Sequence, residues 1–217
     1  FVQWYKKGKN SNLQQSRCFA EGFFLRNKLK EKKILDSGSI DKTLNRLSHE
    51  IYENSKEFDQ IVLIGIHNRG VPLSRRLKDK VEKISGIRYE NGAIDISFHR
   101  DDYRKRLSVP KVRGSDIPFN LDGKVVILVD DVLYTGRTIR AAIEELNSFG
   151  RALKIQLAVL VDRGHRELPI KADYVGKNIP THEGEHVNVL LNEVDGKEYV
   201  SLIKGWKIKK CLKINIY

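Results

Sequence analysis

The feature that most constrains the fold is the stretch of residues 125–138, VVILVDDVLYTGRT. Five consecutive branched apolar residues run directly into two adjacent aspartates and then into a Thr-Gly-Arg-Thr loop. An apolar run without alternation predicts a strand that is buried on both faces, as in a parallel sheet covered by helices on both sides. Apolar residues at helical spacing between Ile139 and Leu146 indicate that the loop leads into a helix.

Strand and helix patterns alternate along most of the chain. The patterns predict helices over 39–53 and 73–84, and strands over 61–66, 93–98, 155–161, 174–176 and 187–191. Such alternation implies right-handed crossovers and an α/β fold, with a mainly parallel twisted sheet flanked by helices.

The order of residues after the apolar run indicates a ligand site. In a parallel sheet, ligands bind beyond the carboxyl ends of the strands, where Asp130 and Asp131 are expected. The hydroxyls of Thr135 and Thr138, the bare Gly136 and the N–H groups of a helix N-terminus suit a phosphate. The carboxylates suit a ribose diol or a hydrated Mg²⁺ instead. Together they describe a site for a phosphorylated sugar; the alternative is a helix cap followed by a simple turn.

The stretch resembles the phosphoribosyl-pyrophosphate (PRPP) motif of type I phosphoribosyltransferases, and specifically the PyrR family of pyrimidine operon attenuation regulators. Three further segments resemble the same family: IGIHNRG at 64–70, DISFHRDD at 95–102, and most of 156–181. The resemblance covers about residues 30–204. It implies the type I phosphoribosyltransferase fold, with a small hood and a flexible loop over the site.

The resemblance also implies a reaction and the residues that perform it. Ribose 5-phosphate passes from PRPP to N1 of uracil, giving UMP and pyrophosphate, with Mg²⁺ as cofactor. Asp130 and Asp131 would hold the ribose hydroxyls and the metal, directly or through water, and Arg69 would face the pyrophosphate. The implied catalytic residues are Asp130, Asp131, Arg69 and Arg100, and the implied PRPP-binding residues are Tyr134, Thr135, Gly136, Arg137, Thr138, Gly70 and Asp102.

Two of these assignments have a structural alternative. Arg69 on a surface turn could equally be a solvated charge. The charged stretch 100–114 is too long and polar for a compact connection, which indicates either a lid carrying Arg100 and Asp102 or a hairpin without a role. A lid would exclude water from the reactive sugar.

Uracil is small and neutral, so backbone groups can recognise its edge. The segment Val161-Asp162-Arg163 follows a predicted strand into a loop and is the candidate uracil site. Asp162 and Arg163 could instead form a structural ion pair, and the residues do not separate these two readings.

The family resemblance implies a second partner, a stem-loop in the leader of pyrimidine biosynthetic mRNA, bound more tightly with UMP. The RNA-binding face is attributed to a basic surface on a dimer, which implies a homodimer or a higher homo-oligomer. The matching positions are Asn45, Arg46, His49, Arg166 and Lys171. Position 45 commonly carries a hydroxyl residue in the family, and Asn there weakens that single assignment. Without the resemblance, such residues are usually a solvated face.

The net charge of +12 is concentrated at the two ends of the chain. Residues 1–33 carry +7 and residues 205–217 carry +4, so the intervening part is nearly neutral. We expect a basic extension over 1–28, a phosphoribosyltransferase domain over 29–204 and a basic tail over 205–217. The chain has no Met, and on the hypothesis that Leu29 marks the true start, residues 1–28 are not native protein.

The remaining composition argues for a cytoplasmic protein with no membrane partner. Cys18 and Cys211 lie near opposite ends, which is neither a disulfide framework nor a zinc-binding spacing. No apolar run approaches the length of a membrane span.

Two other functions share the same PRPP site. A purine phosphoribosyltransferase is disfavoured because no aromatic residue directly follows Val161 to stack on a purine. A nucleotide-sensing RNA-binding regulator without turnover is disfavoured because the expected site residues are intact. A phosphoribosyltransferase that acts only in base salvage remains an alternative.

Overall fold

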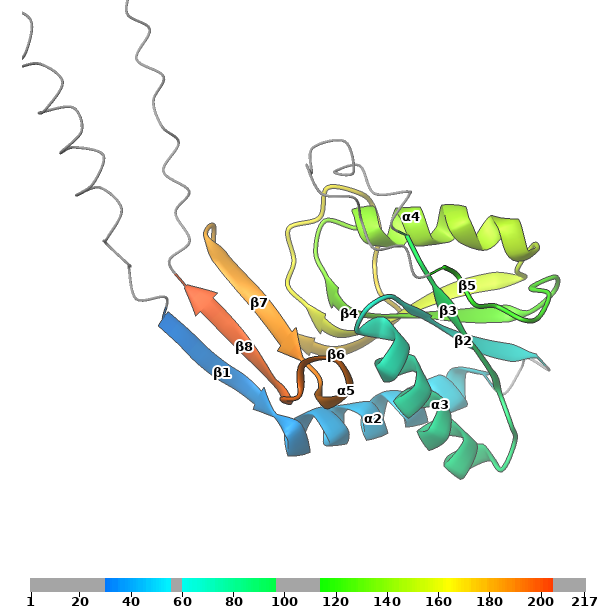
Figure 1. The fold of residues 1–217 in the computed structure, drawn as a ribbon, viewed down its shortest axis with the longest axis horizontal. Helices are drawn as coiled ribbons and strands as arrows, with labels where there is room; N and C mark the ends of the chain where they lie inside the picture. The colour runs from blue at the N-terminus through cyan, green and yellow to red at the C-terminus, as the bar shows by residue number, and fades with distance from the viewer. Residues whose placement is uncertain (1–29, 56–59, 97–113, 205–217) are drawn as a thin grey trace, which may run out of the picture.

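The computed structural model describes residues 30–55, 60–96 and 114–204, and these form two sheets with helices around the larger one (Figure 1). The strands are β1 (Lys30–Asp36), β2 (Ile61–Ile66), β3 (Glu90–Ile94), β4 (Val125–Leu133), β5 (Lys154–Asp162), β6 (Tyr174–Asn178), β7 (Glu185–Leu190) and β8 (Tyr199–Lys204). The helices are α2 (Ser37–Ser55), α3 (Gly70–Ser85), α4 (Arg137–Leu146), the 3₁₀ turn η2 (Asn147–Phe149) and α5 (Asn192–Asp195). Within the described part of the chain, no helix is long and apolar enough to cross a membrane.

The larger sheet is parallel throughout and has the strand order β3-β2-β4-β5-β6. Helices α2 and α3 cover one face and α4 covers the other (Figure 1). In β4, Val125, Ile127 and Val129 join the core beneath α2 and α3, while Val126 and Leu128 join the core beneath α4. The unalternating apolar run is therefore explained, because both faces of the strand are buried.

The smaller sheet is antiparallel and has the order β1-β8-β7. We call this sheet, together with the β7–β8 connection that carries α5, the hood. It lies beside the parallel sheet and pairs strands from the two ends of the described chain (Figure 1). Its apolar residues Leu35, Val189, Leu191 and Val200 extend the core that α2 closes.

The structure confirms the parallel sheet and the three long helices, and it corrects three strand predictions. The strand expected over 93–98 is instead β3, which begins earlier and ends at Ile94, while 97–98 lie outside the described residues. The strand expected over 187–191 is β7 and belongs to the hood. Strand β4 continues through Leu133, because the backbone of Asp130 and Val132 still pairs with β5. Backbone pairing needs no apolar side chain, so the first aspartate did not mark the strand end.

Candidate functional site

The site lies at the rim where the carboxyl ends of β2, β4 and β5 meet. Asp130 and Asp131 are the sixth and seventh residues of β4; Asp130 is buried and Asp131 is half-buried. Each carboxylate accepts a hydrogen bond from the next backbone N–H: Asp131 N donates to Asp130 Oδ1 at 2.9 Å, and Val132 N donates to Asp131 Oδ1 at 2.9 Å. These bonds fix both side chains against the strand.

Asp131 differs from a surface carboxylate in its electrostatics. Burial raises the pKa of Asp131, and the positive charge of Arg69 opposes that rise. A carboxylate in such a place gains from any donor or cation that enters the site, because its own charge is poorly solvated.

The phosphate loop, residues 134–138, connects β4 to α4. Gly136 has a φ of +91°, and a Cβ at this position would lie 3.3 Å from Ile170 Cδ1. Thr135 O accepts hydrogen bonds from Glu167 N at 3.0 Å and Leu168 N at 3.1 Å, which tie the loop to the β5–β6 connection. Gly136 has no side chain to cap α4, and the first amide of the helix, Arg137 N, donates only a long bond of 3.4 Å to Thr135 Oγ1. The amides of this turn therefore keep the anion-binding character expected of the loop.

The loop between β2 and α3 brings Arg69 to the same rim. A peptide bond in this loop, His67–Asn68, is cis. A Cβ on Gly70 would lie 2.3 Å from Val129 O, so the first turn of α3 can approach β4 this closely only with glycine. Arg69 donates to Asp195 of α5 through Nε (3.0 Å to Oδ2) and Nη2 (2.8 Å to Oδ1).

The expected uracil segment lies at the end of β5. Val161 is fully buried in the core, while Asp162 accepts from Gly164 N at 2.9 Å and from Arg166 Nη2 at 2.5 Å. The alternative reading, an ion pair between Asp162 and Arg163, is wrong, because the partner of Asp162 is Arg166.

Arg163 is buried and joins three parts of the molecule. Its side chain donates to Thr181 Oγ1 at 3.3 Å and to Glu185 O of the hood at 3.0 Å. Its guanidinium carbon lies 3.9 Å from the ring centroid of Tyr134 in the phosphate loop. Arg163 therefore links the phosphate loop, the end of β5 and the hood.

The candidate RNA-binding residues fall into two groups. Asn45, Arg46 and His49 lie on α2, and Arg46 bonds Glu50 and the carbonyls of Val175 (2.9 Å) and Gly176 (2.7 Å) in β6. Asn45 accepts from Lys80 Nζ at 2.6 Å. His49 lines a hollow of about 180 Å³ between α2 and α3.

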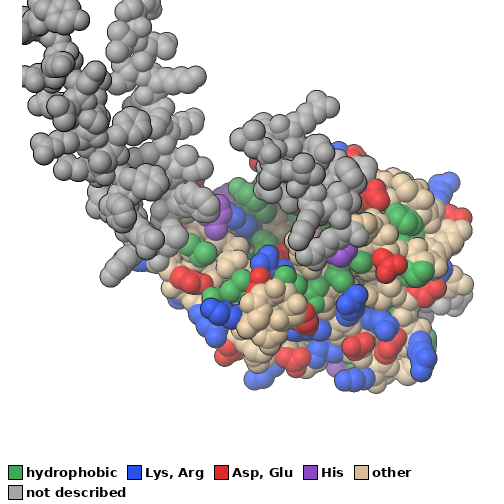
Figure 2. Space-filling view, in the orientation of Figure 1, with side chains coloured by type: hydrophobic (Ala, Val, Ile, Leu, Met, Phe, Trp, Pro, Cys, Tyr) green, Lys and Arg blue, Asp and Glu red, His purple; other side chains and the backbone are tan. Residues whose placement is uncertain are grey.

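The second group, Arg166 and Lys171, lies in the β5–β6 connection. Lys171 is exposed. Arg166 donates to the carbonyls of Tyr134 (2.8 Å), Gly164 (3.2 Å) and Ile170 (3.0 Å) besides Asp162. On the face shown in Figure 2, basic and acidic side chains are interspersed.

Several residues at the site carried no signal in the sequence. Asp195, Glu193 and Glu198 come from the hood and contact Arg69 or Arg76, more than one hundred residues earlier in the chain. Helix α5 has only four residues, too few for a periodic pattern. Arg100 and Asp102 lie outside the described residues, so the lid prediction is untested.

The donor set at the rim fits Mg²⁺. Within the described ranges, no cluster of three or more His, Cys, Asp or Glu side chains forms a metal cage. Mg²⁺ commonly binds through one or two carboxylates, with waters and substrate phosphates completing its shell. Asp130 and Asp131 supply two such carboxylates side by side.

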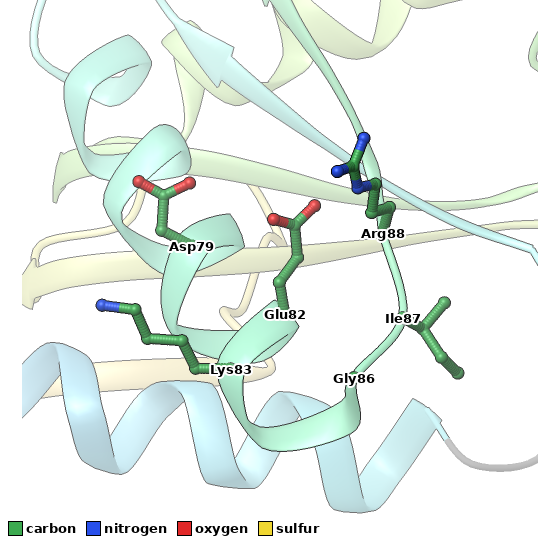
Figure 3. A pocket seen from close by; sticks show the side chains of 6 residues that line it. All are labelled: Asp79, Glu82, Lys83, Gly86, Ile87 and Arg88. Carbon is green, nitrogen blue, oxygen red and sulfur yellow. The ribbon is translucent and has the colours of Figure 1, made fainter.

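A second hollow lies away from this rim, at the C-terminal end of α3 (Figure 3). It measures about 380 Å³ and is lined by Asp79, Glu82, Lys83, Gly86, Ile87 and Arg88. Arg69 precedes the opposite end of the same helix, so this hollow is separate from the candidate site.

Comparison with known proteins agrees with the geometry of the rim. The family described as "Phosphoribosyl transferase domain" matches residues 31–193. The "Bifunctional protein PyrR" of Pelotomaculum thermopropionicum is 50% identical over 171 residues, which cover 79% of this chain and 94% of the relative. The chain belongs to the PyrR family. The protein of the same name from Clostridioides difficile is 48% identical, over 80% of this chain and 98% of the relative.

These matches confirm three predictions from the sequence: the family, the fold class and the phosphoribosyltransferase activity. Solved structures agree on the fold: a hypoxanthine phosphoribosyltransferase from Staphylococcus aureus superposes with a TM-score of 0.59 at 21% identity, covering 80% of this chain and 92% of that one. The hypoxanthine phosphoribosyltransferase of Trypanosoma cruzi gives 0.62 at 17% identity, covering 80% and 96%. At these identities the likeness concerns the fold alone.

Proposed function

We propose that this PyrR-family protein transfers ribose 5-phosphate from PRPP to N1 of uracil and binds leader mRNA in a UMP-dependent manner. The observation that carries the enzymatic part is the single rim shared by the paired aspartates, the phosphate loop and Arg69. The identity of about half to proteins named PyrR supports the substrate and the regulatory partner.

The reaction separates two opposite charges. Breaking the bond at the anomeric carbon builds positive charge on the ribose while pyrophosphate leaves as a polyanion. Asp130 and Asp131 hold the ribose hydroxyls and add negative potential beside the ring, and the phosphate loop fixes the 5-phosphate through backbone amides. Both groups are preorganised, since the aspartates are bonded to their own strand and the loop to the β5–β6 connection.

Arg69 and Mg²⁺ serve the leaving group. The guanidinium is permanently charged and can pair with phosphate oxygens bidentately. Asp130 and Asp131 would hold Mg²⁺, directly or through water, and the ion would supply positive charge against the leaving pyrophosphate. Arg100 and Asp102 are proposed to contribute from the lid.

Uracil is proposed to meet the segment Val161-Asp162-Arg163 at the end of β5. The buried Val161 side chain can only line the base site. Two backbone groups of the segment are engaged within the protein: Arg163 N donates to Leu133 O at 3.1 Å, and Ile179 N donates to Asp162 O at 2.8 Å. Asp162 and Arg163 then act mainly by shaping the loop, since both are bonded to neighbouring groups.

The enzymatic proposal is tested by following UMP formation from uracil and PRPP. We expect Mg²⁺-dependent product with uracil and little product with hypoxanthine. Preference for hypoxanthine would point to purine salvage, and RNA binding without turnover would point to a pure regulator.

The RNA-binding proposal rests on Asn45, Arg46, His49, Arg166 and Lys171. Arg166 offers a physical route from nucleotide to RNA, because it bonds carbonyls on both sides of the proposed nucleotide site, at Tyr134 and Gly164. Ordering of these loops by UMP would fix Arg166 and the chain that leads to Lys171.

Filter binding of a leader stem-loop, with and without UMP, tests this proposal. We expect UMP to increase retention, and Lys171→Gln to weaken it, in the full chain and in a chain trimmed to residues 29–204. The trimmed chain matters because the basic ends could bind phosphates without regard to sequence. Equal retention in the presence and absence of UMP would exclude regulation by nucleotide. Light scattering on the same samples tests the proposed homodimer or larger homo-oligomer.

A further inference from the structure

Helix α5 of the hood contacts Arg69, the residue that is proposed to face the pyrophosphate. Asp195, the last residue of α5, accepts two hydrogen bonds from Arg69, of 3.0 and 2.8 Å. The two residues are 126 positions apart in the chain, so the contact joins the hood to the β2–α3 loop. We propose that Asp195 is a positioning residue that orients Arg69 toward the pyrophosphate of PRPP. This inference rests on the proposed role of Arg69.

The carboxylate of Asp195 is itself fixed to the core. Its Oδ2 accepts from Leu191 N at 3.0 Å, and its backbone N–H donates to Leu191 O at 2.7 Å. Leu191 is fully buried among core residues, and Gly196 ends the helix with a φ of +64°. A carboxylate tied to a buried residue in this way can hold a long, otherwise flexible arginine side chain in one orientation.

The geometry of the pair leaves the guanidinium usable for substrate. Asp195 occupies the edge formed by Nε and Nη2, so the other N–H donors of the group point elsewhere. The bond to Asp195 raises the pKa of Arg69, and the charge of Asp131 adds to that rise. Arg69 therefore lies between the hood and the paired aspartates, where a leaving pyrophosphate is proposed to pass.

The hood does not depend on Asp195 for its attachment. Arg76 of α3 pairs bidentately with Glu193 of α5, at 2.7 Å for each bond, and also with Glu198. Glu198 accepts further bonds from Ser37 at 2.7 Å and Asn192 at 3.2 Å. Loss of the Asp195 carboxylate should release Arg69 without releasing the hood.

The experiment measures steady-state kinetics with PRPP for Asp195→Asn, with Glu193→Gln as the matched control. Both changes remove one carboxylate from the same helix, but only the first touches Arg69. Because the pyrophosphate charge grows as the bond breaks, disorder in Arg69 should lower kcat more than it raises KM: about tenfold against less than about threefold. The control should stay within about twofold of wild type in both constants.

A double-mutant cycle with Arg69→Gln separates positioning from a structural role. If Asp195 acts through Arg69, adding Asp195→Asn to Arg69→Gln should cause no further loss. Three results would each overturn the positioning role. The losses of activity in Asp195→Asn and Arg69→Gln could multiply in the double variant, Glu193→Gln could lose as much activity as Asp195→Asn, or Asp195→Asn could have a lower KM for PRPP. Near-wild-type activity in Arg69→Gln would overturn the proposed function of Arg69 itself. A large loss of activity in Arg69→Gln with no change in Asp195→Asn would overturn only this inference.

Discussion

The phosphate-loop rim and the hood seam are built from different interactions. By the hood seam we mean the polar pairs that join the hood to the parallel sheet: Arg69–Asp195, Arg76–Glu193, Arg76–Glu198 and the bond from Arg163 to Glu185 O. The rim is positioned by backbone hydrogen bonds, buried apolar strands and glycines at close approaches. The seam is positioned by charged side chains. We therefore expect the rim to keep a fixed geometry, while the contacts of the seam, including that of Arg69, can respond to charge.

The largest expected effect comes from removing charge at the rim. Asp131→Asn should lower kcat/KM for PRPP by at least about a hundredfold, because a neutral amide cannot stabilise the positive ribose or hold Mg²⁺ as well. The fold should not suffer, since burial already raises the pKa of Asp131 and disfavours its charged form. Activity assays and thermal melts on the same preparation give both values; activity within tenfold of wild type would place the reaction elsewhere.

A steric change at the rim should act mainly on stability. Gly70→Ala would place a Cβ 2.3 Å from Val129 O, and moving α3 away from β4 should cost about 2–4 kcal/mol of the free energy of unfolding. Denaturant unfolding measures this cost.

Gly38→Ala is the matched control for that change. Gly38 also lies in the first turn of a helix, but its Cβ would meet only Asp36 Oδ1, at 3.9 Å. We expect a neutral or slightly stabilising effect, within about 1 kcal/mol, from the better helix propensity of Ala. Similar losses in both variants would show that close packing does not explain Gly70.

Arg163 is a buried charge in the seam, and we expect its loss to have the next largest effect. Arg163→Gln removes the guanidinium that stacks on Tyr134 and bonds Glu185 O, which should cost about 2 kcal/mol of unfolding free energy. The control Arg140→Gln breaks an exposed pair with Glu144 on α4 and should change stability by less than about 0.5 kcal/mol. Equal losses of stability in Arg163→Gln and Arg140→Gln would mean that burial of Arg163 does not increase its contribution to stability.

The same contrast explains what the sequence could predict. Strands β2, β4 and β5 are buried on both faces, so their apolar runs identify them, and the phosphate loop follows β4 within a few residues. Strand β1 reads KEKKILD and is largely exposed, so its place in the hood depends on pairing with β8 at the far end of the described chain. No local sequence pattern predicts a pairing between strands so far apart in the chain.

The site divides along the same line. The positions of Asp130, Asp131 and the phosphate loop at the rim of the sheet were predictable, because one continuous stretch contains them. The partners of Arg69, Arg76 and Arg163 come from segments far away in the chain. The sequence around a single charged residue does not identify the residue that it contacts in the fold. Asp162 shows the difficulty, since its partner proved to be Arg166 rather than its neighbour Arg163.

The smallest expected effect is a selective loosening of the hood in acid. The hydrogen bond from Arg69 lowers the pKa of Asp195 below its ordinary 3.8. For Glu193, burial acts to raise the pKa, but the hydrogen bond and charge of Arg76 together with a backbone hydrogen bond outweigh burial and leave the pKa below 4.5. A carboxyl group whose folded pKa is depressed stabilises the fold above its unfolded pKa, and that stabilisation disappears as the pH falls through the folded value. The seam should therefore be intact at neutral pH and weaken only below about pH 4.5, by roughly 1 kcal/mol because the pairs are partly exposed.

Hydrogen exchange at pH 7 and pH 3.5, corrected for intrinsic rates, measures this loosening. Amides of β7 and β8 should lose protection relative to those of β4 and β5, which backbone pairing and apolar burial hold in place. In Asp195→Asn the acid-dependent difference should shrink, because one of the two titrating partners is gone, while Arg140→Gln should leave it unchanged. If β4 and β5 loosened as much as the hood, acid would be acting on the whole fold, and the division between a backbone-held rim and a charge-held seam would be wrong.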